Sequence, residues 1–190
     1  MLEKYFKDAS EKFAKPFVLV LAKFKIKPNT VSILGLIIVL LGSYFFYVDN
    51  KFLGIILIFL GSAVDGLDGP YARYQNLVSE KGAVLDSFID RLGELFIWSV
   101  VAIGFTSNDI ELFIVLSILV ASNLIPYIRA KSESYGITNK AGITARPERV
   151  IFAVIFMFFD LDYVFMYIFS LLCWITCLLY TSDAADDCWS

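Results

Sequence analysis

Four aspartates lie close together in the first half of the sequence, and as a group they could do chemistry. Within each pair the spacing is three or four residues, so each pair would lie on one face of a helix. Four carboxylates in one pocket repel one another unless a cation compensates them, and hard divalent cations prefer such oxygen ligands. A site for one or two metal ions is the simplest interpretation, and a structural network with nearby arginines is the alternative. The four residues are Asp65, Asp68, Asp86 and Asp90.

The composition indicates a membrane protein and limits its chemistry. Of the 190 residues, 58% are hydrophobic and 18% are charged, whereas soluble domains are about 45–50% apolar. The chain has no histidine, which excludes Ser-His and Cys-His nucleophile pairs and imidazole-ligated zinc. The three cysteines all lie near the C-terminus without a second ligand pair, so we interpret them as small apolar residues of a membrane span.

Apolar runs predict an all-α integral membrane protein with six transmembrane helices. Three runs approach the length of about 20 residues that a span requires: residues 30–48, 112–128 and 163–180. Three shorter runs become spans only if each helix continues into flanking charged sequence: residues 52–64, 95–107 and 150–159. Ionisable residues at membrane depth mark functional sites, so we expect a polar cavity that holds the four aspartates. We predict a single domain over residues 1–180, followed by a tail of different composition at residues 181–190.

The basic residues predict the orientation in the cell membrane. Of the 16 lysines and arginines, only Lys51 falls on the side opposite to the others, so both termini and the cavity should face the cytoplasm. Residues 1–24 combine apolar positions at helical spacing with lysines. An amphipathic helix bound to membrane lipids fits this pattern, and a cytosolic helix packed on the membrane domain is the alternative.

The stretch between Asp65 and Asp90 resembles the signature of the CDP-alcohol phosphotransferase family at every fixed position. Members of this family displace CMP from a CDP-linked lipid with an alcohol. The six-helix layout and the N-terminal amphipathic helix also resemble the family. The pattern is Asp65-x-x-Asp68-Gly69-x-x-Ala72-Arg73, eight further residues, and then Gly82-x-x-x-Asp86-x-x-x-Asp90.

The resemblance implies roles for the motif residues. The four aspartates would hold divalent ions, two Mg²⁺ or alternatively Mn²⁺, and Asp90 would also be the general base. Arg73 would clamp the diphosphate, because a guanidinium suits phosphate oxygens. Small residues would admit the nucleotide. They are Gly69, Ala72 and Gly82.

Two further segments have an ordinary structural interpretation beside the functional one. Ser79 could donate to a phosphate or be a solvated turn residue. The start of the first span resembles the segment that closes over the CDP moiety, and it is also an ordinary helix N-terminus; it comprises Asn29, Thr30, Val31 and Ser32. For Gly66 we expect tight helix packing.

A basic cluster before the fifth span suggests the acceptor. Clustered cations suit an alcohol that already carries a phosphate, although anchoring at the cytoplasmic face also explains them. The local pattern resembles the phosphatidylinositol-phosphate synthase branch and its archaeal ether-lipid counterpart, where such residues bind inositol 1-phosphate. The residues are Arg129, Lys131, Arg146 and Arg149.

We therefore predict transfer from CDP-diacylglycerol or CDP-archaeol to inositol 1-phosphate with release of CMP. Glycerol 3-phosphate as the acceptor is the alternative within the class, and a cation transporter is the alternative outside it. A homodimer is expected from the family and from the frequency of two-fold assemblies. Nothing in the sequence predicts a nucleic-acid partner.

Overall fold

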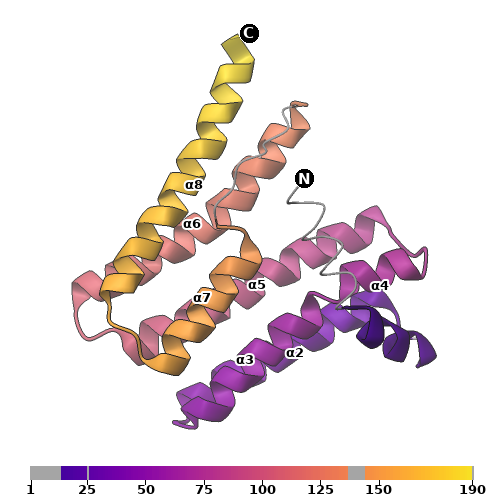
Figure 1. Ribbon diagram of the computed structural model, residues 1–190, viewed down its shortest axis with the longest axis horizontal. Helices are drawn as coiled ribbons and strands as arrows, with labels where there is room; N and C mark the ends of the chain where they lie inside the picture. The colour runs from indigo at the N-terminus through magenta and orange to yellow at the C-terminus, as the bar shows by residue number, and fades with distance from the viewer. Residues whose placement is uncertain (1–13, 25, 137–143, 190) are drawn as a thin grey trace.

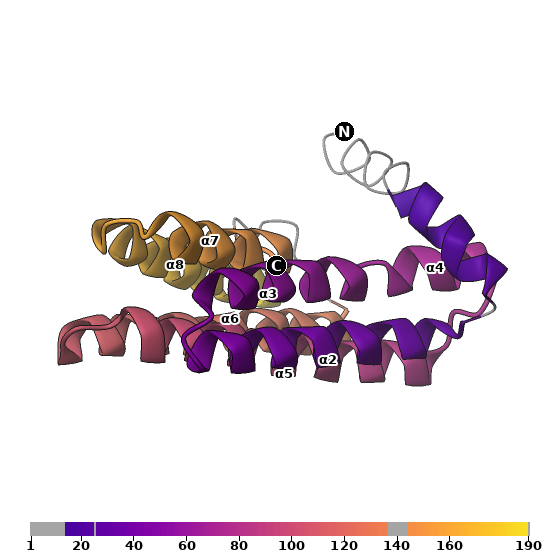
Figure 2. The ribbon, with the colours of Figure 1, turned by 90° about the horizontal axis from the view of Figure 1, so that it is seen from below.

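The computed structural model describes residues 14–24, 26–136 and 144–189, with side chains up to residue 181, and every regular element in this part of the chain is an α-helix. Figure 1 shows a bundle of long helices in which α2 and α3 lie beside α5, and α7 lies beside α8. Figure 2 shows α3 and α7 in a layer above α2, α5 and α6. The elements are α2 (Pro28–Tyr47), α3 (Lys51–Asp65), α4 (Asp68–Tyr74), α5 (Glu80–Phe105), α6 (Asp109–Ser134), α7 (Arg146–Phe159) and α8 (Val164–Trp189).

Four stretches of the described residues are long and apolar enough to cross a membrane. They are α2 (Pro28–Tyr47), α3 together with α4 (Lys51–Tyr74), α6 (Asp109–Ser134) and the first part of α8 (Val164–Thr181). The other two predicted spans correspond to α5 and α7. The 26 residues of α5 would suffice in length, but its first half carries the charged motif. The 14 residues of α7 extend about 21 Å at 1.5 Å per residue, less than the hydrocarbon core of about 30 Å.

The predicted helix starts are confirmed where the sequence punctuates them. Pro147 lies in the first turn of α7, where its missing N–H costs nothing. The N-terminal amphipathic helix is seen over residues 14–23; the rest of its predicted range lies outside the described residues. The second apolar run continues through Asp65 and Asp68, as expected, because Lys51–Tyr74 is one stretch long and apolar enough to cross a membrane. The helix is interrupted inside this stretch, where α3 ends at Asp65 and α4 begins at Asp68.

Glycines bring α2 and α3 into direct backbone contact. Gly35 and Gly42 on α2 face Gly54 and Gly61 on α3, with a spacing of seven residues in each helix. A Cβ atom added at any of the four would lie 2.7–2.8 Å from a backbone atom of the other helix. Small residues are what allow membrane helices to approach this closely. Gly66 is not part of this contact, contrary to expectation: it is exposed and ends α3, and an added Cβ would approach nothing closer than 3.6 Å.

The remaining helices pack around aromatic and aliphatic side chains. Trp98 on α5 and Phe156 on α7 are each 1% exposed, and Phe152 stacks on Phe169 of α8 with ring centroids 3.8 Å apart. Cys173 and Cys177 are buried free thiols in the same core, which confirms that they serve as apolar residues. This core holds α5 and α7 side by side, and both contribute to the carboxylate site.

The α2–α3 contact predicts that Gly42→Ala destabilises the protein, because its Cβ would lie 2.7 Å from the backbone nitrogen of Ile58. Overpacking of this kind costs about 1–3 kcal/mol. Thermal unfolding in detergent measures the loss, and Gly66→Ala is the matched control. Equal unfolding midpoints for the two variants would contradict the packing account.

Candidate active site

Three carboxylates from three helices converge. Asp65 is the last residue of α3, Asp68 is the first of α4, and Asp86 lies in the second turn of α5. One oxygen from each lies within 4.8 Å of the others. The break between α3 and α4 places the first two aspartates at adjoining helix ends. The convergence of these three residues agrees with the motif-based prediction.

Asp68 is held in place from α2. Ser32 is buried on the second turn of α2, and its hydroxyl donates to Asp68 Oδ2. Asp65, at the end of α3, lies directly against Gly35 of α2. The sequence placed Ser32 in the segment that faces the nucleotide; in the structure it supports a carboxylate instead.

Arg146 of α7 bridges the first and fourth aspartates. Its Nη2 lies 2.6 Å from Asp65 Oδ2, and its Nη1 lies 2.5 Å from Asp90 Oδ1. Arg91 Nη2 is 3.8 Å from the other oxygen of Asp90. The fourth aspartate is therefore an ion-pair partner of arginines, beside the group formed by the first three.

The donor set fits a divalent cation. All the groups that converge are carboxylate oxygens, which Mg²⁺ and Mn²⁺ prefer. Asp65 Oδ1 is buried and has no hydrogen-bond partner among the described residues, and a buried acceptor of this kind normally has one. Arg146 and Arg91 contribute two positive charges against the four carboxylates, so excess negative charge remains for a cation.

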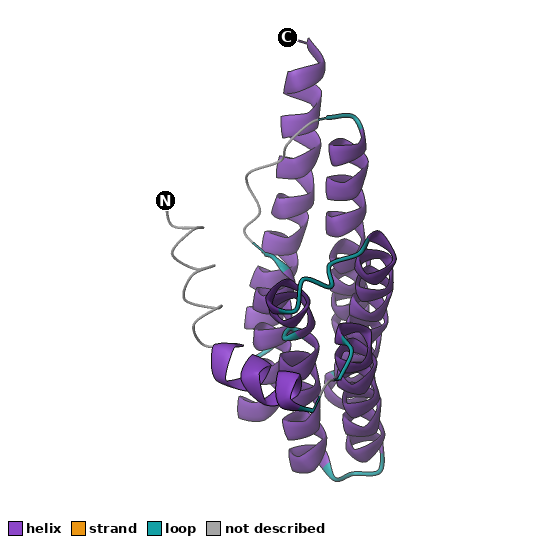
Figure 3. Cartoon of the chain, turned by 90° about the vertical axis from the view of Figure 1, so that its right-hand side faces the viewer, coloured by secondary structure: helices purple, strands orange, loops and turns teal. Residues whose placement is uncertain are grey.

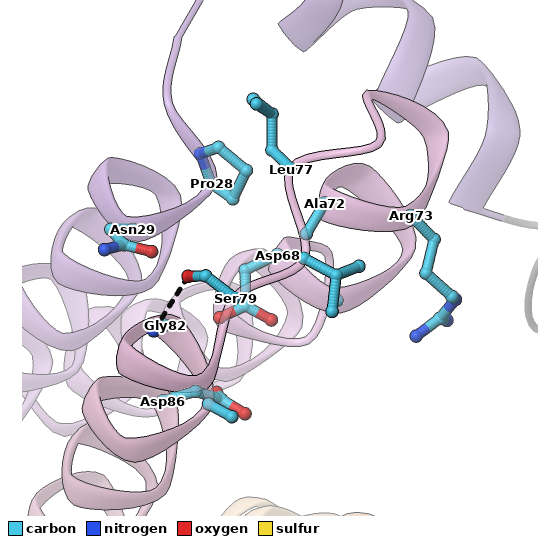
Figure 4. Close-up of a pocket in the computed structure, with 12 residues that line it drawn as sticks. Pro28, Asn29, Asp68, Ala72, Arg73, Leu77, Ser79, Gly82 and Asp86 are labelled. Atoms are coloured by element: carbon cyan, nitrogen blue, oxygen red, sulfur yellow. Dashed lines mark hydrogen bonds between the residues drawn. The ribbon is translucent and has the colours of Figure 1, made fainter.

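Asp68 and Asp86 lie in the wall of a cleft of about 290 Å³. Figure 4 shows Asp68 and Asp86 below the opening, with Asn29 on one side and Ala72 on the other. Ser79 caps the N-terminus of α5 by accepting a hydrogen bond of 3.1 Å from the Gly82 backbone. The lining residues are Pro28, Asn29, Asp68, Gly69, Ala72, Arg73, Leu77, Val78, Ser79, Gly82, Ala83 and Asp86.

Six residues predicted to bind the CDP group thus line this cleft: Asn29, Gly69, Ala72, Arg73, Ser79 and Gly82. The three residues after Asn29 have other surroundings. Thr30 is exposed, Val31 is 1% exposed in a small apolar cluster, and Ser32 contacts Asp68.

Among the predicted acceptor residues, the structure brings Arg146 into contact with the motif carboxylates. Arg129 pairs with Glu133 on its own helix at 3.0 Å, and the Lys131 ammonium lies 4.8 Å from the ring centre of Tyr135. Arg149 is 1% exposed. It donates to Glu94 from Nε and Nη2 and to the Thr144 carbonyl from Nη1.

Glu94 is a site residue that the sequence analysis missed. It lies four residues beyond Asp90 on α5, as Arg149 lies three residues beyond Arg146 on α7. The two helices therefore meet through two successive ion pairs, Asp90–Arg146 and Glu94–Arg149. The continued i, i+4 spacing of acids along α5 was the signal that could have identified it.

A second cavity of about 260 Å³ lies between α3 and α7. Arg146 contributes to its wall, so the groove borders the carboxylate site. The other lining residues are mostly apolar or small: Phe59, Ser62, Ala63, Gly66, Pro147, Val150 and Ile151.

Comparison with known proteins agrees with this geometry. A family model described as CDP-alcohol phosphatidyltransferase matches residues 25–181. The chain is 36% identical over 157 residues to the archaetidylinositol phosphate synthase of Pyrococcus horikoshii, covering 82% of each protein. The fold is similar to that of the Mycobacterium tuberculosis phosphatidylinositol phosphate synthase with CDP-DAG bound, with a TM-score of 0.78 and 26% identity over 91% of this chain and 94% of that one. The same enzyme in complex with manganese and citrate matches with a TM-score of 0.76 and 27% identity, covering 90% of this chain and 88% of that one.

The convergence of Asp65, Asp68 and Asp86 predicts that divalent cations stabilise the folded protein. A ligand that binds only the folded state, at a hundredfold excess over its Kd, adds about 2.7 kcal/mol. We expect Mn²⁺ or Mg²⁺ to raise the unfolding midpoint of the wild type, and Asp86→Asn to remove most of this rise. Glu80→Gln, an exposed acid in the first turn of α5, is the control. A rise of equal size in Asp86→Asn would exclude these carboxylates as the ligands.

Proposed function

Because the chain belongs to the CDP-alcohol phosphatidyltransferase family, we propose that it transfers the phosphatidyl-type group of a CDP-linked lipid to inositol 1-phosphate and releases CMP. One observation carries the proposal. Asp68 and Asp86 belong both to the converging carboxylates and to the wall of the cleft. A diphosphate bound in the cleft would therefore lie against the metal ligands.

The cleft suits the CDP group. Gly69 and Gly82 leave space where side chains would narrow it: an added Cβ at Gly82 would lie 3.0 Å from Ser79 Oγ and 3.4 Å from Asn29 Oδ1. Asn29 and Ser79 offer polar atoms to the nucleotide, and Arg73 brings a guanidinium to the diphosphate. Thr30 lies on the first turn of α2 beside Asn29. Val31 packs in the small apolar cluster, and Ser32 holds Asp68, so both would support the cleft without lining it.

The groove between α3 and α7 suits a lipid chain. Its walls include Phe59, Val150 and Ile151, and Arg146 lies where it borders the carboxylates. A CDP-linked lipid would then place its head group in the cleft and a chain in this groove. CDP-diacylglycerol and CDP-archaeol share this head group, so the groove fits either lipid.

The four motif aspartates would bind the metal ions and accept the proton in the transfer reaction. Bound divalent cations, two Mg²⁺ in this proposal, would neutralise the diphosphate and the charge that develops during transfer. Asp65, Asp68 and Asp86 would hold them, with Asp90 as a further ligand. The acceptor oxygen forms a bond to the phosphorus that carries the lipid, and the bond from that phosphorus to CMP breaks. Arg146 holds Asp90 Oδ1, so Oδ2 would take the proton of the attacking hydroxyl.

The basic residues suit an acceptor that carries a phosphate. Of the four predicted acceptor residues, Arg146 contacts the motif carboxylates, and we assign it to the acceptor phosphate with Arg129 and Lys131. Arg149 is included in this assignment, but Glu94 and Thr144 engage its guanidinium nitrogens. Acceptor binding there would require Arg149 to exchange these partners. Glycerol 3-phosphate would use the same charges and stays the alternative acceptor.

The helices suit six spans with the site on the cytoplasmic side. Figure 1 shows the short connections α2–α3, α5–α6 and α7–α8 at one end of the bundle and α4 toward the other. Apart from Lys51, the basic residues that favour the cytoplasmic face precede α2, lie in α4 and the first half of α5, or lie from the end of α6 to the start of α7. None of these stretches is one of the three short connections. A homodimer in the cell membrane is part of the proposal, on the general frequency of two-fold assemblies.

Replacing the proposed base tests the mechanism. We expect Asp90→Asn to lower kcat for CMP release by about a hundredfold or more, because proton transfer by a positioned group contributes about 10²–10⁴-fold. Binding of CDP, measured by titration calorimetry, should persist. Ser87→Ala, an exposed residue of the same helix, is the control. A kcat within twofold of the wild type would contradict the assignment.

The acceptor is tested by CMP release from CDP-diacylglycerol and CDP-archaeol with four alcohols in parallel. These are inositol 1-phosphate, free inositol, glycerol 3-phosphate and serine. We expect inositol 1-phosphate to give the highest kcat/KM, because the site offers cations to the acceptor phosphate. A higher value with glycerol 3-phosphate would select the alternative, and a higher value with an uncharged acceptor would contradict the phosphate site.

A further inference from the structure

Tyr71 is a buried polar residue for which the proposed function gives no role. It lies on α4 between Asp68 and Arg73 and is 1% exposed. Its hydroxyl donates to the backbone carbonyl of Ile26 at 2.5 Å, and the carbonyl of Leu21 lies 3.4 Å away. A buried tyrosine hydroxyl needs such a partner. These contacts span 45 and 50 residues of sequence, so they join separate parts of the fold.

Tyr71 belongs to a small apolar cluster that is separate from the main core. The cluster joins the N-terminal helix, the first turn of α2, and the α3–α4 junction. Figure 2 shows the N-terminal helix leaving the bundle at the end where α4 lies, and Figure 3 shows it as a separate arm beside the other helices. The buried members are Ala14, Val18, Val31 and Tyr71, with Leu21, Ala22, Ile26, Val64 and Leu67 packed around them.

The acceptor of the Tyr71 hydrogen bond immediately precedes the nucleotide cleft. Ile26 comes just before Lys27, the N-cap of α2, and the next two residues, Pro28 and Asn29, line the cleft. On α4, Asp68 and Gly69 before Tyr71 and Ala72 and Arg73 after it line the cleft, and Figure 4 shows Ala72 across the cleft from Asn29. The Tyr71–Ile26 hydrogen bond therefore ties together the two walls between which the cleft opens.

We propose that Tyr71 is a positioning residue that sets the separation between the start of α2 and α4, and through it the affinity for the cytidine diphosphate group. The inference rests on the proposed function, because it assigns the cleft to that group. Tyr71 does not line the cleft, so it would act through Ile26 and the adjoining Pro28 and Asn29. The same bond anchors the N-terminal helix, so a disturbance of that helix would also reach the cleft.

The test compares Tyr71→Phe with Tyr74→Phe. Both changes remove one hydroxyl from the same helix, but Tyr74 is 52% exposed. Three experiments are carried out on the full chain. Titration calorimetry gives the Kd of CDP, the CMP-release assay gives kcat and KM for CDP-diacylglycerol, and amide hydrogen exchange is followed at residues 14–24. The loss of one buried hydrogen bond corresponds to about three- to tenfold in an equilibrium constant.

We expect Tyr71→Phe to raise the Kd of CDP and the KM for CDP-diacylglycerol by about three- to tenfold, with kcat within twofold of the wild type. Exchange at residues 14–24 should accelerate, and Tyr74→Phe should match the wild type in all three. An unchanged Kd would overturn the proposal, and so would a lower kcat with unchanged KM, which indicates a loss of folded protein. If the wild type binds CDP but releases no CMP, the proposed function fails, and the Kd comparison still decides the role of Tyr71.

Discussion

The arrangement of the helices around the site depends on how the negative charge of Asp65, Asp68, Asp86 and Asp90 is compensated among apolar helices. Buried ionisable groups are costly unless they are paired or bind a ligand. Arg146 spans Asp65 and Asp90, and Arg91 lies 3.8 Å from Asp90, so two guanidinium groups face four carboxylates and leave negative charge on Asp68 and Asp86. The same imbalance that would destabilise a structural cluster suits a site for divalent cations and a diphosphate. Charge compensation by a bound ligand is thus the constraint that links this fold to its chemistry.

The rest of the bundle supplies the rigidity that this compensation requires. The glycine contact of α2 with α3 places Asp65 against Gly35, and Ser32 on the same helix holds Asp68. On the other side, the Glu94–Arg149 pair lies next to Asp90–Arg146 and is almost fully buried. A buried pair of this kind is strongly destabilising when one partner is lost, so α7 is fixed relative to α5. Both flanks of the site therefore rest on contacts that tolerate little displacement.

The sequence predicted what local spacing determines. The convergence of the aspartates could be predicted because it follows from their short spacings along the sequence and from nearby helix ends. The start of α7 could be predicted from Pro147, which lies in its first turn. The sequence did not predict which arginine meets Asp65, because that pairing joins residues 81 positions apart. Positive charge near a membrane face likewise did not distinguish Arg149, which is buried, from Arg129, which is exposed. The glycines of α2 and α3 acquire their meaning only from the partner helix, which a single sequence does not identify.

The central claim is that the carboxylates and the cleft form one site, in which divalent cation and nucleotide bind together. Titration of CDP into the purified protein, once with Mg²⁺ and once with EDTA, tests it most directly. We predict that removing the metal raises the Kd of CDP by about tenfold or more, which corresponds to a coupling free energy of about 1.4 kcal/mol or more. The same Kd in both conditions would contradict the claim, because metal and diphosphate would then bind independently.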